Sequence, residues 1–296
     1  MSDKMRALAF GEVLWDDDGT IQTLGGAPFN VLGHLSRLGG EGTLISAVGK
    51  DVLGDRTLAA ATEFCIDCHL VNRSEYQTGK ALITLSNGIP SYAFTEPSAW
   101  DDISLTDFQV KELSNEHYDA FIFGTLASRT SKTENCLFSV LENIKASEFF
   151  FDVNIRLGFY SYEMILKALK YTTILKMNAD EVPIISKATG IPERSLPLEI
   201  QKKFPVKKIL ITRGKDGSVC YFGKKEVNAS AGEIKVLDTV GAGDSLSAAF
   251  LFFLWAGLDT DESLYKASRL ADYVVARRGA IPVYDDDIRM MLSIPS

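Results

Sequence analysis

Short apolar strands alternate with helix-like segments through the second half of the chain, and this alternation constrains the fold more than any other feature. Continuous apolar runs recur after about residue 118, and most precede a segment with helical spacing. Such a pattern is typical of a mostly parallel sheet covered on both faces. The predicted strands are 121–123, 149–151, 173–176 and 209–211, and the last of them leads into a predicted hairpin at 218–222. The predicted helices are 134–144, 162–169, 181–189, 245–255 and 262–277, and a short tail covers 285–292.

The N-terminal part departs from this rhythm because it contains two predicted hairpins. Polar or turn-forming residues at 16–19 and 87–90 separate strand-like segments. We expect these excursions, at about 12–24 and 77–100, to form a small separate sheet placed as a lid. The predicted strands are 6–15, 20–24, 44–48, 80–85 and 92–94, and the predicted helices are 28–38 and 53–64.

Length and composition indicate an ordinary soluble protein. The 296 residues are expected to form one domain, 1–296, and 46% are hydrophobic and 24% charged. A formal net charge of −8 argues against nucleic-acid or anionic-membrane partners, which need clustered Lys and Arg. No segment resembles a signal peptide and the longest apolar run, 246–258, is too short to span a bilayer, so we expect a cytoplasmic location.

The pair Cys65 and Cys68, followed by His69, resembles half of a zinc site. The chain has no second Cys or His pair with matching spacing. A redox motif would open a helix, whereas this pair follows one. We therefore interpret these cysteines as structural.

The segment Asp238-Thr239-Val240-Gly241-Ala242-Gly243-Asp244 leads directly into an apolar helix. Two glycines allow a tight turn, and the free N–H groups of the helix start form an anion site. Asp244 stands at its mouth, where a carboxylate repels a resident anion. The pairing is understandable if the anion is a phosphoryl group in transfer and Asp244 accepts the proton of the attacking hydroxyl.

The segment is also compatible with other functions. Asp244 could simply cap the helix, because Asp is a favoured N-cap residue. The sequence lacks G-x-x-x-x-G-K-[ST], which excludes a P-loop on motif grounds. A dinucleotide-binding motif fits poorly, since Leu246 occupies the third glycine position and no βαβ unit follows.

Three further motifs follow predicted strands: Gly25-Gly26-Ala27-Pro28-Phe29-Asn30, Asn178-Ala179-Asp180-Glu181 and Thr212-Arg213-Gly214-Lys215-Asp216-Gly217. With 238–244 they resemble the ribokinase-like (PfkB) family of carbohydrate kinases over essentially the whole chain. Within that family the segments 11–16, 96–101, 124–129 and 152–156 are most similar to bacterial fructokinases. The resemblance implies a ribokinase-like three-layer α/β/α sandwich with a mostly parallel central sheet and a small β-sheet lid.

The resemblance also implies roles for individual residues. Asp244 would be the general base, with Gly241, Ala242 and Gly243 stabilising the transferring phosphoryl group. Expected sugar-binding residues are Asp16, Gly25, Gly26, Asn30, Phe94 and Arg156, the last with a phosphate contact or a surface ion pair as alternatives. Expected nucleotide-binding residues are Lys176, Asn178, Thr212, Gly214, Gly217, Gly241, Gly243, Ala271 and Val275, although core packing explains Ala271 and Val275 equally well.

Family members hold the Mg²⁺ of MgATP with an Asn-x-x-Glu motif, usually through water. Here Asn178 and Glu181 would do so, from one helical face. A monovalent cation such as K⁺ is expected at Asp238 and Val240. Asp272 stands where relatives often carry a small or amide residue, which leaves the nucleotide preference open.

We therefore expect an ATP-dependent sugar kinase, with fructose as the substrate and fructose 6-phosphate as the product. Alternatives are a ribokinase, a 2-keto-3-deoxygluconate kinase, a nucleoside or aminoimidazole-riboside kinase, and a non-catalytic sugar-binding relative. The free edge and apolar face of the lid (Ala81, Ile83, Leu85) predict a homodimer through it.

Overall fold

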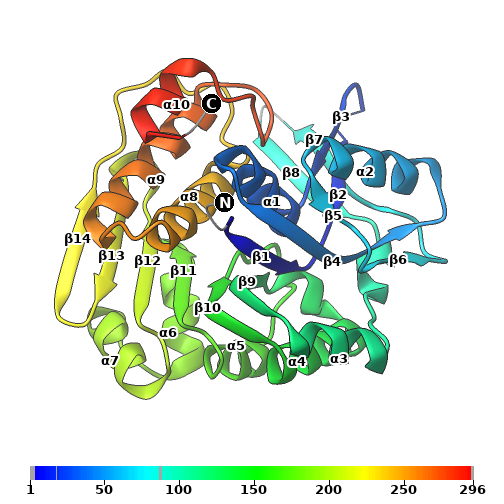
Figure 1. Ribbon diagram of the computed structural model, residues 1–296, viewed down its shortest axis with the longest axis horizontal. Coiled ribbons are helices and arrows are strands. Elements are labelled where there is room, and N and C mark those ends of the chain that lie inside the picture. Colours follow the sequence, from blue (N-terminus) through cyan, green and yellow to red (C-terminus); the bar gives the residue numbers. More distant parts are fainter. Residues whose placement is uncertain (1–3, 18, 87–88, 295–296) are drawn as a thin grey trace.

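A ten-stranded sheet lies between two layers of helices in the computed structural model, which describes residues 4–17, 19–86 and 89–294 (Figure 1). The order is β14-β13-β12-β11-β10-β9-β1-β4-β5, with β6 paired to β4. Its strands are β1 (Arg6–Phe10), β4 (Glu41–Gly49), β5 (Ile66–Asp67), β6 (Val71–Ser74), β9 (His117–Gly124), β10 (Lys145–Asp152), β11 (Ile174–Asn178), β12 (Lys208–Thr212), β13 (Ser218–Phe222) and β14 (Lys225–Ala229).

The sheet is parallel except at one edge. Strand β1 lies between β4 and β9, with Phe10 opposite both Ile45 and Phe123. Only the β12–β13 and β13–β14 pairs of this sheet are antiparallel among the described residues. The parallel strands therefore bring their carboxyl ends to a common edge, where open α/β sheets bind ligands.

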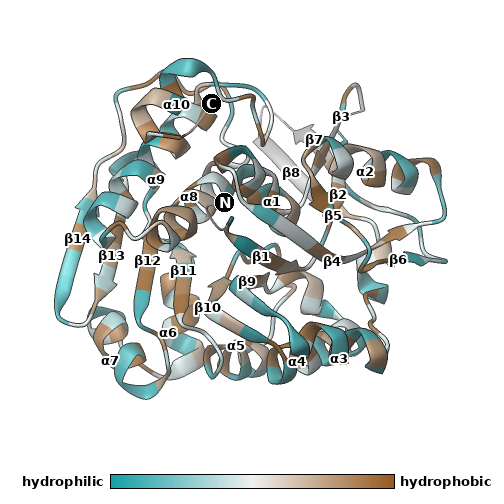
Figure 2. Ribbon diagram, viewed as in Figure 1, coloured by the Kyte–Doolittle hydropathy of each residue, from teal (hydrophilic) through white to brown (hydrophobic). Residues whose placement is uncertain are grey.

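Both faces of the sheet are buried, which explains why its strands are continuously apolar. On β1, Ala7 and Ala9 belong to the core under α1, α8, α9 and α10, whereas Leu8 and Phe10 belong to the core under α4 to α7. Figure 2 shows hydrophobic residues along the central strands β10 to β12. The α/β/α sandwich expected from the sequence is thus confirmed.

The helices of the two layers have the following bounds. They are α1 (Ala27–Leu38), α2 (Val52–Glu63), α3 (Asp107–Asn115), α4 (Ser131–Asn143), α5 (Tyr162–Leu169), α6 (Val182–Thr189), α7 (Leu196–Lys203), α8 (Ala242–Trp255), α9 (Thr260–Val275) and α10 (Asp286–Leu292). Within the described ranges, none of them is long and apolar enough to cross a membrane.

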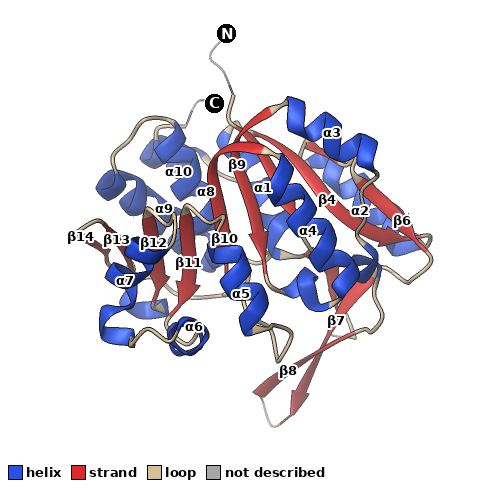
Figure 3. Cartoon of the chain, turned by 90° about the horizontal axis from the view of Figure 1, so that it is seen from below, coloured by secondary structure: helices blue, strands red, loops and turns tan. Residues whose placement is uncertain are grey.

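A second, four-stranded sheet is formed by the two predicted hairpins. Its order is β3-β2-β7-β8, from β2 (Leu14–Asp17), β3 (Gln22–Gly25), β7 (Gly79–Ser86) and β8 (Ile89–Phe94). Figure 3 shows β7 and β8 projecting from the body of the molecule. The expected small separate sheet is confirmed, although turn residues Asp18, Asn87 and Gly88 lie outside the described part.

The single strand predicted over 6–15 is wrong. Strand β1 ends at Phe10, and β2 begins at Leu14 in the other sheet. Between them, Gly11 has φ +151° and passes so close to Pro28 that a Cβ would stand 2.6 Å from Pro28 Cγ. The chain therefore leaves the main sheet where it meets the start of α1.

Five helices and strands of the described residues lie outside the predicted ranges: α3, α7, β5, β6 and β14. The signal for α3 was present, because Thr106 and Gln109 form a capping box at its start. Strands β5 and β6 are short, with two and four residues. Their pairing with β4 is a tertiary contact, which a local sequence pattern does not reveal.

Candidate active site

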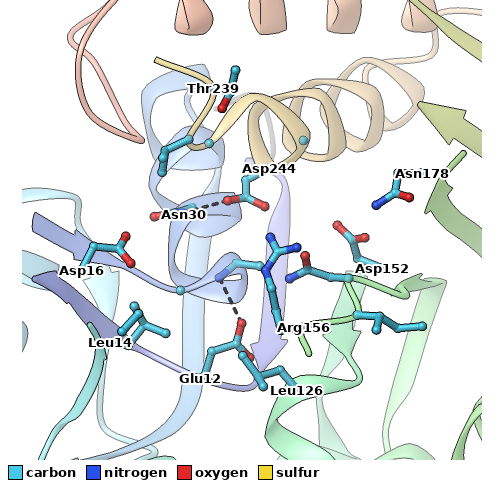
Figure 4. A pocket seen from close by; sticks show the side chains of 18 of the residues that line it. Glu12, Leu14, Asp16, Asn30, Leu126, Asp152, Arg156, Asn178, Thr239 and Asp244 are labelled. Atoms are coloured by element: carbon cyan, nitrogen blue, oxygen red, sulfur yellow. Dashed lines mark hydrogen bonds between the residues drawn. The ribbon is translucent and has the colours of Figure 1, made fainter. Parts of the chain in front are cut away.

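A cavity of about 480 Å³ opens at the carboxyl ends of the parallel strands and is flanked by the small sheet. The structure brings together thirteen of the residues predicted for the site. They are Asp16, Gly26, Asn30, Phe94, Arg156, Lys176, Asn178, Glu181, Thr212, Val240, Gly241, Gly243 and Asp244. The side chains that surround this cavity are drawn in Figure 4.

One wall of the cavity is the glycine turn that precedes α8. Gly241 is the N-cap residue of α8, with φ +79°, and a Cβ there would stand 2.3 Å from the carbonyl oxygen of Ala280. Asp244 lies in the first turn of the helix, so the interpretation of Asp244 as an N-cap is wrong. The amides of the first turn have no intrahelical acceptors and carry the positive end of the helix dipole into the cavity.

Asp244 is held in place by the helix α1, which packs beside α8. Asn30, on α1, donates a hydrogen bond of 2.8 Å from Nδ2 to Asp244 Oδ2 (Figure 4). Burial raises the pKa of Asp244, and the charges of Lys176 and Arg156 oppose that rise. The structure thus provides a fixed carboxylate with enhanced basicity, as a general base requires.

The part of the cavity next to the small sheet gathers Glu12, Asp16 and Arg156. We call it the sugar half because the sequence predicts sugar binding there. Glu12 is 4% exposed, accepts a hydrogen bond from the Ala27 amide, and has its pKa raised to about 7 by burial. Burial likewise raises the pKa of Asp16 to about 6. Arg156 reaches the middle of the cavity, where its charge lowers the pKa of both carboxyls (Figure 4).

The opposite part contains a buried ion pair, and we call it the phosphate half because the sequence predicts phosphate binding there. Lys176 Nζ lies 2.5 Å from Asp152 Oδ2, and both side chains are less than 10% exposed. A Cβ on Gly243 would stand 3.2 Å from Lys176 Nζ, so this ammonium group adjoins the start of α8. An anion bound here would meet both the helix dipole and a lysine.

Asn178 and Glu181 do not share a helical face as predicted. Asn178 ends β11, and Glu181 is the N-cap residue of α6. The Glu181 carboxylate accepts 2.7 Å hydrogen bonds from the amides of Ile155 and Asn178, and burial raises its pKa. Both residues still line the cavity, and because backbone groups already bind the carboxylate, they suit a Mg²⁺ held through its waters.

Seven predicted residues do not line the cavity: Gly25, Gly214, Gly217, Asp238, Ala242, Ala271 and Val275. Gly25 ends β3, Ala242 begins α8, and Gly214 and Gly217 lie in the β12–β13 connection. Ala271 and Val275 lie on α9, where the Val275 carbonyl accepts from the Leu237 amide. The roles assigned to these seven residues stay predictions.

Asp238, predicted to help hold a monovalent cation, organises the glycine turn. Its carboxylate accepts hydrogen bonds from the amide of Val240 at 3.0 Å and the amide of Gly279 at 3.3 Å. Both carboxylate oxygens are thus already engaged by backbone donors. The cation site therefore stays a prediction.

Glu12 and Asp152 are site residues that the sequence analysis missed. Each is an acidic residue at or just beyond the end of an apolar strand, Glu12 after β1 and Asp152 at the end of β10. That position in the sequence could have identified both as candidate site residues. The four cysteines are free, and within the described ranges no group of three or more His, Cys, Asp or Glu side chains could hold a metal ion.

Comparisons with known proteins identify relatives of this chain. The chain is 30% identical over 301 residues to a fructokinase of Escherichia coli, covering 96% of this chain and 94% of the relative. Its fold matches the ATP-bound structure of a fructokinase from Xylella fastidiosa, with a TM-score of 0.84, 19% identity and 98% coverage of both chains. It also matches aminoimidazole riboside kinase from Salmonella enterica, with a TM-score of 0.81, 20% identity, and coverage of 97% of this chain and 99% of that one.

The model of the pfkB family of carbohydrate kinases matches residues 4–287, which is nearly the whole chain. The relatives above cover the two ends of the chain as well as its middle. A glycine turn at a helix start, a carboxylate beside it and the Lys176 ammonium are groups compatible with phosphoryl transfer to a hydroxyl. This chain belongs to the pfkB family of carbohydrate kinases and is a sugar kinase.

Proposed function

We propose that this sugar kinase transfers the γ-phosphoryl group of ATP to the primary hydroxyl of fructose, giving fructose 6-phosphate. The observation that carries the proposal is Asp244, fixed by Asn30 at the start of α8 and beside Lys176. Support for ATP comes from the ATP-bound fructokinase of similar fold, and support for fructose comes from the fructokinase relative.

In the proposed mechanism, Asp244 accepts the proton of the primary hydroxyl as that oxygen attacks phosphorus. The new O–P bond forms while the bond between the γ-phosphorus and the leaving ADP oxygen breaks in line with it. The amides of the glycine turn and the Lys176 ammonium stabilise the negative charge on the transferring group. Asn178 and Glu181 would hold Mg²⁺, which neutralises phosphate charge when bound.

The charges of the sugar half favour a neutral substrate. Glu12, Asp16 and Asp244 place three carboxyl groups around the single guanidinium of Arg156. A substrate carrying a carboxylate, such as 2-keto-3-deoxygluconate, would face this acidic wall. Sugar hydroxyls can instead donate hydrogen bonds to carboxylates and accept them from Arg156.

The charges of the sugar half do not discriminate between fructose, ribose and a neutral riboside, because all three are uncharged. The aminoimidazole riboside kinase of similar fold keeps a riboside as the second candidate substrate. Phe94, which lines the cavity from β8, offers an aromatic surface to a heterocyclic base. If the protein prefers the riboside, the assigned substrate changes but the proposed mechanism stays the same.

The decisive experiment measures ADP release by the purified protein with MgATP and a panel of acceptors. The panel contains fructose, tagatose, glucose, ribose, 2-keto-3-deoxygluconate, adenosine and aminoimidazole riboside. The highest kcat/KM is expected on fructose. A different best substrate would refute the fructose assignment, and no turnover on any acceptor would point to the non-catalytic alternative, to be checked by ligand-induced thermal shifts.

The small sheet is proposed to act as a lid that closes over the sugar and excludes water. Ala81 on β7 is buried and lines the cavity, in keeping with that role. The side chains of Ile83 and Leu85, predicted to form its apolar face, lie outside the described part. The homodimer through this sheet and the cytoplasmic location stay predictions.

A further inference from the structure

His34 lies on α1, one helical turn after Asn30, and is completely buried. Its Nε2 is 2.8 Å from the carbonyl oxygen of Ala280, and its Nδ1 is 2.6 Å from the hydroxyl of Tyr284. A carbonyl oxygen can only accept, so Nε2 carries the proton and Nδ1 accepts from Tyr284. Two hydrogen bonds therefore fix this imidazole in one orientation.

The carbonyl that His34 binds belongs to a residue packed against the glycine turn. A Cβ on Gly241 would stand 2.3 Å from the Ala280 oxygen and 2.8 Å from the Ala280 Cα. Next along the chain, Ile281 packs on the α1 backbone, because a Cβ on Gly33 would stand 2.5 Å from Ile281 Cδ1. We call these contacts of Gly33 and His34 with residues 280–281 the α1 clamp.

The His34 imidazole and the Tyr284 hydroxyl are both neutral groups. Burial lowers the pKa of His34 to about 3 and raises the pKa of Tyr284 above its ordinary value. Arg37, one turn further along α1, stacks over the Tyr284 ring at 6.0 Å from its centroid and adds a positive charge that also disfavours imidazolium. The imidazole therefore acts as a fixed donor and not as a proton carrier.

We propose that His34 is a positioning residue for phosphoryl transfer, which holds Ala280 against Gly241 and so sets the glycine turn relative to Asp244. The proposal rests on the proposed function. One helix, α1, fixes the base through Asn30 and supports the anion-binding turn through His34. A rigid helix that holds both groups keeps their separation constant during the reaction.

Two substitutions of His34, by amide side chains of different length, test the α1 clamp. In His34→Gln the side-chain amide can occupy the place of Nε2 and still donate to Ala280, whereas the shorter amide of His34→Asn occupies the place of Nδ1. We expect His34→Asn to lower kcat on the order of tenfold to a hundredfold with little change in the KM for sugar. His34→Gln is expected to retain most of kcat.

The matched control for stability is Leu38→Ala, which is buried at the end of α1, one turn beyond His34, and takes no part in the α1 clamp. It is expected to lower Tm at least as much as His34→Asn while kcat stays near wild type. Equal loss of kcat in Leu38→Ala, or equal kcat in the Asn and Gln variants, would overturn the proposal.

Hydrogen exchange tests the clamp without relying on turnover. The amides of Val240, Ala242 and Ser245 donate hydrogen bonds within the glycine turn and the start of α8. They are expected to exchange faster in His34→Asn than in His34→Gln, and unchanged exchange would overturn the clamp. If His34→Asn does not fold, Tyr284→Phe serves instead, because it keeps the ring but removes the donor to Nδ1, and the same criterion applies. If the wild-type protein phosphorylates no sugar, the proposed function fails while the exchange result still decides the clamp.

Discussion

The two halves of the cavity obtain their charge in different ways. The phosphate half uses main-chain amides, a helix dipole and the buried Lys176–Asp152 pair. The sugar half uses carboxyl groups, and the pKa values of Glu12 and Asp16 are raised to about 7 and about 6. The phosphate half therefore keeps its charge near neutral pH, whereas the sugar half changes its charge there.

The largest effect is expected where the halves meet, at Asp244. Asp244→Asn should lower kcat by roughly 10² to 10⁴, because it removes the proton acceptor but keeps the shape of the side chain. ATP binding by calorimetry and Tm should stay near wild type. Near-normal turnover in this variant would refute the assigned base.

The wild-type pH profile gives an independent check on that base. Burial raises the pKa of Asp244, and only the deprotonated carboxylate accepts a proton. Turnover should therefore fall as the pH drops through this raised pKa, above the ordinary aspartate range. A kcat that stays constant down to pH 4 would contradict the assignment.

The buried ion pair of the phosphate half should be costly to break. Lys176→Met or Asp152→Asn alone should lower the free energy of unfolding by about 3 to 5 kcal/mol, because each leaves a buried charge without its partner. The double variant should be more stable than the sum of the single losses predicts. Urea unfolding of all three variants measures this, and simple additivity would show that the pair is not coupled.

A carboxyl group of the sugar half should make the free energy of unfolding depend on pH. The pKa of Glu12 rises from 4.5 to about 7 on folding, so the native state binds more protons in that window. Stability from this group is fully present below about pH 4.5 and is lost as the pH rises through about 7, by about 3 kcal/mol. In Glu12→Gln, urea unfolding between pH 4.5 and 7 should show a smaller decline, and an unchanged decline would exclude Glu12 as its source.

The smallest effect is expected for a substitution of Arg156, which tests the half of the cavity to which this residue belongs. Arg156→Gln should raise the KM for sugar roughly tenfold, about 1.4 kcal/mol, with a smaller change in the KM for ATP. The reason is that three carboxyls lose the cation that faces them. Arg156→Lys is the matched control that keeps the charge. A larger rise in the KM for ATP would assign Arg156 to the phosphate half instead.

The same division explains what the sequence could predict. The glycine turn and Asp244 lie within one contiguous segment, because a turn and a helix start are local structures. Glu12 was missed because its importance comes from burial against α1 and from its distance to Arg156, which depend on tertiary packing. The strand predicted over 6–15 failed for a related reason, since only the contact of Gly11 with Pro28 shows where the chain leaves the sheet.

The hydrogen bond between Asn30 and Asp244 joins residues 214 positions apart, and this has a consequence for biosynthesis. At typical elongation rates the ribosome needs roughly 10 to 40 s to pass from one to the other. Strand β1 must likewise wait for β9, its neighbour in the sheet. A nascent chain can therefore join Asn30 to Asp244 only late in translation, when most of the sheet that supports the sugar half has already been synthesised.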